Sequence, residues 1–95
     1  MKQLSWVVTH VPPQFSDVIQ AAWYLKDENN VYYGMVWRPI GTERCGSVHR
    51  LKGLTVPINM KHDTFSEACD YLKKQLSEQQ VLPMGGPDTN WGSMQ

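Results

Sequence analysis

The chain has 95 residues, of which 41% are hydrophobic, and this length supplies one hydrophobic core and excludes a second independent domain. Nine basic residues balance nine acidic ones, so the formal net charge is zero and no overall positive field draws the chain to nucleic acids or membranes. No apolar run reaches the roughly 18 residues of a membrane span, and two cysteines are too few for a disulfide framework. We therefore expect a cytoplasmic globular protein that has no membrane association and keeps its cysteines as thiols.

Residues 3–10 predict the first strand of a sheet. Apolar residues occur at every second position from residue 4 to residue 8, so Leu4, Trp6 and Val8 would lie on one side of the strand. The stretch ends at two successive prolines, which lack the amide hydrogens that a central strand needs. Residues 14–20 have two interpretations, because apolar residues at helical spacing follow Ser16 while the next run, Trp-Tyr-Leu, suits a strand. We favour a turn or short helix near Ser16 and then a strand over residues 19–27.

Residues 21–38 hold five of the ten aromatic residues of the chain around one polar turn. Two apolar runs rich in aromatic and β-branched residues, separated by Asp-Glu-Asn-Asn, predict a β-hairpin with strands over residues 19–27 and 31–40. A three-residue loop over residues 28–30 gives the pairing that divides the hairpin most cleanly into an apolar face and a mixed face. A shift of the pairing by one residue would exchange the side chains of one strand between these faces. Asn30 suits the left-handed conformation that ends such a loop. The predicted core-facing side chains are Trp23, Leu25, Tyr33, Met35 and Trp37.

The other face of this hairpin carries aromatic and basic side chains that we predict to form a partner-binding surface. Its members are Tyr24, Lys26, Tyr32 and Arg38, supplemented by Arg44 in the loop that follows. Tyrosine and arginine dominate the binding hot spots of protein interfaces. The same combination of aromatic planes and cations also suits stacking on nucleobases and contact with phosphates. The structural alternative is that exposed tyrosines simply suit strands.

The second half of the chain predicts another hairpin and a helix. Residues 41–46 form a loop between two glycines, after which strands over residues 47–51 and 54–60 flank a Lys-Gly turn. A proline within the last strand indicates a sheet edge. The capping box Thr-Phe-Ser-Glu begins a helix over residues 64–79, whose apolar stripe must cover a sheet. That stripe contains Phe65, Ala68, Cys69, Leu72 and Leu76.

Together these elements predict an α+β fold in one small domain. An antiparallel sheet of four to five strands, within residues 1–80, is covered on one face by the C-terminal helix. Residues 81–95 are rich in Gly and Pro and lack periodicity, so they predict an irregular tail. An edge strand near Leu4 or Pro57 offers a route to a homodimer, and the alternative is a monomer.

No catalytic, nucleotide-binding or metal motif stands out, so the sequence predicts no cofactor, no metal and no catalytic residue. Cys45 and His49 have the spacing of half a zinc site, but His62 and Cys69 do not supply the other half. A Cys/His nucleophile pair can be drawn from the same residues, yet spacing shows neither a lowered thiol pKa nor an orienting third group. The charged residues of the helix are typical of a solvated face.

We therefore expect a non-enzymatic protein that binds another macromolecule, most readily a protein, as inhibitors and accessory factors of phages or mobile elements do. Nucleic-acid binding is the first alternative. A three-stranded sheet followed by a helix, over residues 31–80, is similar in outline to the arm-binding domains of tyrosine integrases, and this architectural resemblance implies nucleic-acid binding. The second alternative is an enzyme whose site is assembled from scattered residues such as His49, Glu67 and Asp70.

Overall fold

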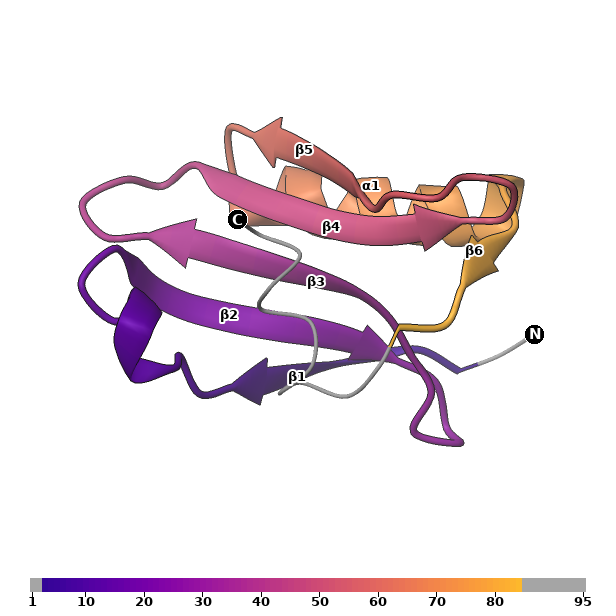
Figure 1. Cartoon of the computed structure of the whole chain (residues 1–95), viewed down its shortest axis with the longest axis horizontal. Helices are drawn as coiled ribbons and strands as arrows, with labels where there is room; N and C mark the ends of the chain where they lie inside the picture. Colours follow the sequence, from indigo (N-terminus) through magenta and orange to yellow (C-terminus); the bar gives the residue numbers. More distant parts are fainter. Residues whose placement is uncertain (1–2, 85–95) are drawn as a thin grey trace.

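The computed structural model describes residues 3–84, which form an antiparallel sheet with one α-helix packed on it (Figure 1). The elements are β1 (Ser5–Thr9), the 3-10 helix η1 (Pro13–Phe15), β2 (Ile19–Lys26), β3 (Tyr32–Pro39), β4 (Cys45–Leu51), β5 (Ile58–His62), α1 (Phe65–Glu78) and β6 (Val81–Leu82). Each strand from β1 to β5 pairs with the next one along the chain, and β6 pairs with β4. The predicted α+β class, with an antiparallel sheet and a C-terminal helix on one face, is confirmed.

The segment between β1 and β2 begins with a proline-nucleated turn. Pro12 and Pro13 open η1, because the fixed φ of proline suits the first turn of a helix. The Phe15 amide donates to the carbonyl of Pro12 at 2.9 Å. This confirms a short helix near Ser16, followed by a strand that starts at Ile19.

The second hairpin turns where the sequence predicts, but its strands have different bounds. Gly53 has a φ of 91°, the left-handed conformation expected for glycine in this turn. β4 begins at Cys45 rather than at residue 47, and β5 covers Ile58–His62 rather than residues 54–60. Pro57 explains the late start of β5, because proline has no amide hydrogen to donate to a strand pair.

α1 begins at the predicted capping box. Thr64 Oγ1 accepts a hydrogen bond from the Glu67 amide at 3.1 Å. The Glu67 carboxylate accepts one from the Asp63 amide at 3.3 Å, one residue before the expected donor. The buried side of α1 consists of Ala68, Cys69 and Leu72. Among residues 3–84, no helix is both long enough and apolar enough to cross a membrane.

The first hairpin has the predicted turn but not the predicted pairing beyond it. The Asp27 amide donates to the Val31 carbonyl at 3.0 Å, and Asn30 has a φ of 62°, as the three-residue loop requires. A β-bulge at Tyr33 then shifts the pairing by one residue. The pairs that follow from the turn are Lys26 with Tyr32, Leu25 with Gly34, Tyr24 with Met35, Trp23 with Val36 and Ala22 with Trp37. The predicted division of this hairpin into an inner and an outer face is therefore wrong for Met35 and Trp37 of β3, whereas Trp23 and Leu25 of β2 lie on the α1 side as predicted.

A buried carboxylate explains the bulge. Asp27 is only 2% exposed, and its Oδ1 accepts hydrogen bonds from the amides of Asn29 and Val31 at 2.8 and 3.0 Å. Its Oδ2 accepts a hydrogen bond from the Tyr33 hydroxyl at 2.9 Å. A buried charge is unfavourable unless it is hydrogen-bonded. The extra residue in β3 lets Tyr33 make this bond, and the rest of the strand follows in the shifted register.

Each face of the sheet carries a buried core, formed with different parts of the chain. The core on the α1 side consists of Leu25, Val36, Cys45, Ala68 and Leu72. The core on the other side consists of Ile19, Ala22, Tyr24, Met35, Trp37, Val48 and Met84. Val11 and Phe15, on the segment around η1, pack against this second core. The sequence predicted that Met35 and Trp37 lie beneath the helix. They lie instead on the opposite side of the sheet.

Residues 81–84 are ordered against the sheet rather than irregular. β6 pairs with the end of β4, and Met84 forms a bridge to Tyr32 of β3. The Met84 amide donates to the Tyr32 carbonyl at 2.7 Å. The remainder of the predicted tail, residues 85–95, lies outside the described residues.

Candidate functional site

Tyr24, the first member of the predicted partner-binding surface, is fully buried. It packs in the core away from α1, where the half-buried Tyr32 meets it edge-on with the ring centroids 5.5 Å apart. Trp23, at the preceding position of β2, is half-buried and thus more exposed than Tyr24. The predicted exposure of Tyr24 is wrong, because the shifted register pairs it with Met35 of the core instead of with Gly34.

The basic members of that predicted surface do not lie together. Lys26 Nζ donates to Asn30 Oδ1 at 2.6 Å beside the hairpin turn. Arg38 follows Val36 by two residues on β3, which places it on the α1 side of the sheet, opposite Tyr24. Arg44 is in the exposed loop before β4, 3.9 Å from Asp63 in a solvated ion pair that contributes little to stability.

A different aromatic group is open to solvent on the α1 side of the sheet. Phe65, at the start of α1, packs against Trp6 of β1 and Trp23 of β2, with ring centroids 6.1 and 4.4 Å away. Val8 pairs with Trp23 in the β1–β2 register and is 71% exposed, while the three aromatic residues are half-buried. We call Trp6, Val8, Trp23 and Phe65 the aromatic ledge.

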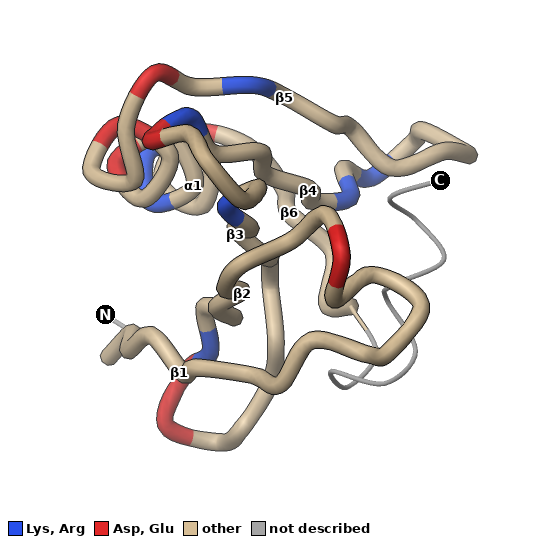
Figure 2. The backbone as a smooth tube through the Cα atoms, turned by 90° about the vertical axis from the view of Figure 1, so that its left-hand side faces the viewer, with Lys and Arg blue, Asp and Glu red and all other residues tan. Residues whose placement is uncertain are grey.

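The aromatic ledge is open because α1 does not cover the whole sheet. α1 packs on β3, β4 and β5, and Figure 1 shows it behind β4 and β5, with β1 and β2 beyond its edge. Figure 2 shows no charged residue along β1, in keeping with its sequence Ser-Trp-Val-Val-Thr. The alternation of Leu4, Trp6 and Val8 pointed to one apolar side of β1, but the predicted register placed Trp23 in the core and hid the ledge.

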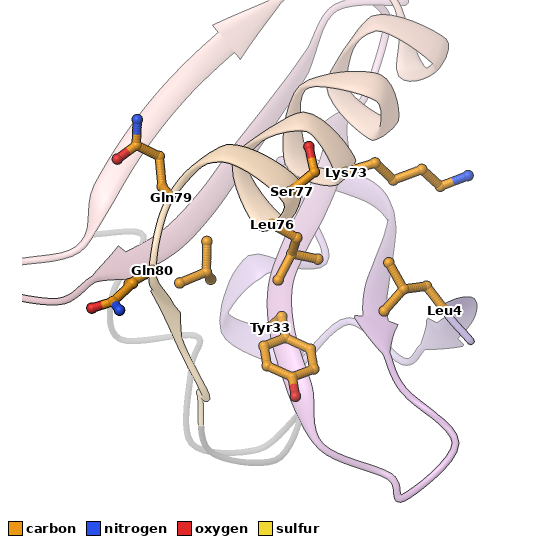
Figure 3. Close-up of a pocket in the computed structure, with 8 residues that line it drawn as sticks. Leu4, Tyr33, Lys73, Leu76, Ser77, Gln79 and Gln80 are labelled. Atoms are coloured by element: carbon orange, nitrogen blue, oxygen red, sulfur yellow. The ribbon is translucent and has the colours of Figure 1, made fainter. Parts of the chain in front are cut away.

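The ledge continues into a groove of about 630 Å³ between β1 and the C-terminal end of α1. The groove is lined by Leu4, Tyr33, Lys73, Leu76, Ser77, Gln79, Gln80 and Val81. Figure 3 shows Leu4 and Leu76 on opposite sides of it, with the Tyr33 ring below Leu76. Leu4 lies just before β1 and two residues before Trp6, and both pack against the core on the α1 side, so the ledge and the groove are neighbours along α1.

The cysteine and histidine residues singled out in the sequence gather beneath α1. Cys45 pairs with His62 across β4 and β5, and Tyr71 of α1 contacts His49 and His62 with ring centroids 5.5 and 4.9 Å away. Burial raises the pKa of Cys45, an effect that the nearby Arg38 guanidinium opposes. Among residues 3–84, no three His, Cys, Asp or Glu side chains are arranged to hold a metal ion.

The two thiols and the one serine in this region are not arranged as accessible nucleophiles. Burial raises the pKa of Cys69 to about 11, so its thiol is protonated at neutral pH. Ser47 Oγ lies 2.9 Å from His62 Nε2, which resembles a nucleophile and its base, but Ser47 is fully buried. A substrate has no direct path to that hydroxyl while α1 is in place.

Acid is expected to destabilise the fold through His49. This side chain is fully buried, and neither ring nitrogen has a hydrogen-bond partner among the described residues. Burial lowers the pKa of His49, and also that of His62, where the Glu67 carboxylate opposes the effect. As the pH falls, the unfolded chain takes up protons before the folded one does, so the stability present above about pH 6.5 is lost below it.

Denaturant unfolding between about pH 7.5 and about pH 5 measures this loss. His49→Phe keeps an aromatic ring against Tyr71 and removes the titrating group, so the variant should lose less stability over the same range. An equal loss in His49→Phe would show that His49 does not cause the acid sensitivity.

No family model, curated protein or solved structure matches this chain. Of the groups described above, the aromatic ledge is the one that combines large apolar side chains with access to solvent.

Proposed function

We propose that this protein acts by binding another protein through the aromatic ledge and does not catalyse a reaction. The observation that carries the proposal is the 71% exposure of Val8 beside three half-buried aromatic rings. Tryptophan is enriched in binding hot spots, where a rigid ring already held by its neighbours loses little conformational entropy on contact. Trp6 and Trp23 are held in this way, because both pack against Phe65.

The surroundings of the ledge support a protein partner over a nucleic acid. A nucleic-acid site needs several cations to neutralise phosphates. β1 carries no charge, and Arg38 is the one basic residue of β1, β2 and β3 that we place on the ledge side. The burial of Tyr24 also removes one of the two rings that were expected to stack on bases. A partner with a complementary apolar surface fits the ledge better.

The proposed setting is the cytoplasm, where a reducing environment keeps two buried cysteines as thiols. A small domain with an open aromatic surface suits an inhibitor or accessory factor of the phage or mobile-element type. Such a protein needs no active site, because it acts by blocking a surface of its partner.

Quantitative affinity capture from a lysate of the native host, with matched variants, tests the proposal. Val8→Lys places a charge on the ledge at a position that is already exposed, so the fold should survive. Val56→Lys is the control, because Val56 is 66% exposed and precedes β5 at the far edge of the sheet. We expect at least one protein to be recovered equally by the wild type and Val56→Lys, and about tenfold less by Val8→Lys.

That protein is then purified and its affinity measured directly by calorimetry. A similar loss of affinity with Val8→Lys would support the ledge as the contact surface. If every captured protein is recovered equally by both variants, the ledge is not the binding site and the proposal fails.

A further inference from the structure

The outer edge of β1 is unusually well suited to pairing with another strand. Among the described residues nothing pairs with it, since β1 ends the strand order. Exposed edge strands normally carry a lysine, a proline or a bulge that discourages pairing. β5, at the other edge, contains Lys61 and follows Pro57. β1 has none of these features and pairs with β2 without a register shift.

We infer that β1 pairs antiparallel with β1 of a second copy of this chain, about a two-fold axis that passes beside Val7. The inference deepens the proposed function and rests on it, because the pairing would join two aromatic ledges into one binding surface. The sheets of the two copies become continuous. The two aromatic ledges lie side by side on one face of this sheet, with the α1 helix of each copy on the outer side of its own ledge.

The sequence of β1 is complementary to itself in this register. A two-fold axis perpendicular to an antiparallel pair requires one residue to face its own copy. With Val7 at that position, Trp6 lies opposite Val8 of the second copy, and Ser5 lies opposite Thr9. Aromatic residues opposite β-branched ones, and Ser opposite Thr, are favourable cross-strand pairs. An axis at Trp6 or Val8 would leave part of the strand unpaired.

The pairing also accounts for the exposure of Val8. In a single copy Val8 is 71% exposed, although it lies on the same side of β1 as the half-buried Trp6. In the pair, Trp6 of the second copy packs against one side of Val8, and the rest of the Val8 side chain belongs to the joined surface. The chain has no net charge, so electrostatic repulsion between copies is weak. Because the strand has only five residues, the interface is at the small end of specific associations, and the dimer should form reversibly.

Sedimentation velocity over protein concentrations from about 1 μM to about 1 mM tests the association. We expect the wild type and Val56→Lys to dimerise with similar dissociation constants, and Val8→Lys to dimerise at least tenfold more weakly. A wild type that stays monomeric over the whole range, or a dimer that both variants preserve equally, would overturn the inference.

Disulfide trapping tests the register. Paired Cα atoms in an antiparallel sheet lie about 4.5 to 5.5 Å apart, within the range that a disulfide spans. Val7→Cys should therefore form a cross-linked dimer under mild oxidation, whereas Ser5→Cys should form one only when mixed with Thr9→Cys. The wild type measures any contribution from Cys45 and Cys69, which are buried. Cross-linking of Ser5→Cys alone to the same extent as Val7→Cys would contradict this register.

The two proposals fail in different ways. If the chain is monomeric but a captured partner still depends on Val8, the protein-binding function stands and the pairing is wrong. If the chain dimerises through Val7 but no partner depends on Val8, the pairing stands and the proposed binding function is wrong.

Discussion

Gly46→Ala is expected to destabilise the protein by about 3 kcal/mol or more, because the added methyl group has no space. Gly46 pairs with Trp37 across β3 and β4, and the Trp37 indole lies directly over it. A Cβ at Gly46 would overlap the ring atoms Cζ2 and Cε2 of Trp37. The indole is rigid and sits in the core at 9% exposure, so relieving the overlap requires the core or the strands to move.

Gly34→Ala, on the neighbouring strand, is the matched control. A Cβ there would lie 3.0 Å from Cδ1 of Leu72, the end of a flexible side chain, and 3.2 Å from the Val48 carbonyl oxygen, so shifts of a few tenths of an ångström accommodate it. Denaturant unfolding of both variants should show a clearly smaller loss of free energy for Gly34→Ala. If Gly46→Ala is no worse than Gly34→Ala, the indole is not packed as described.

Tyr24→Ala is expected to lower the free energy of unfolding by about 3 to 5 kcal/mol, the loss typical of removing a buried aromatic side chain. Tyr24 has no exposed surface and packs with Met35 and Trp37 in the core away from α1. The loss should match or exceed that for Leu72→Ala, which opens the core on the helix side and is expected to lose about 2 to 5 kcal/mol. Chemical denaturation measures both.

Tyr32→Ala provides the contrast for this prediction. Tyr32 is half-buried at the margin of the same core, edge-on to Tyr24, so its removal should lower stability much less. Equal losses for the two tyrosines would contradict the face assignment. The expected difference also means that Tyr24 is a poor probe of partner binding, since its loss would destabilise the domain. Val8 is the better probe.

Features that depend on a few neighbouring residues were predicted correctly. The capping box at Thr64 begins α1, Gly53 makes the second hairpin turn, and Asn30 takes the left-handed conformation at the end of the first. Each depends on steric preferences or on hydrogen bonds within about four residues, which a sequence displays directly. The α+β class followed from the same local patterns, because strand and helix periods differ.

The register of the first hairpin was not predictable from these patterns. Its division into an apolar and a mixed face assumed that one face of the sheet is solvated, as in many antiparallel sheets. Here Val11, Phe15 and Met84 cover the second face, so both faces are apolar and the pattern no longer selects one register. The buried bond between Asp27 and Tyr33 then decides in favour of a bulge.

By itself, the sequence determined the α+β class, the order of β1 to β5 and α1 along the chain, and the turns of both hairpins. Only the tertiary structure decided which apolar side chains are exposed: Tyr24 is in the core, while Trp6, Val8 and Trp23 form the open ledge with Phe65. The physical reason is that exposure depends on how far α1 and the segments around η1 and β6 reach across the sheet. Those contacts join residues far apart in the chain, and no local preference encodes them.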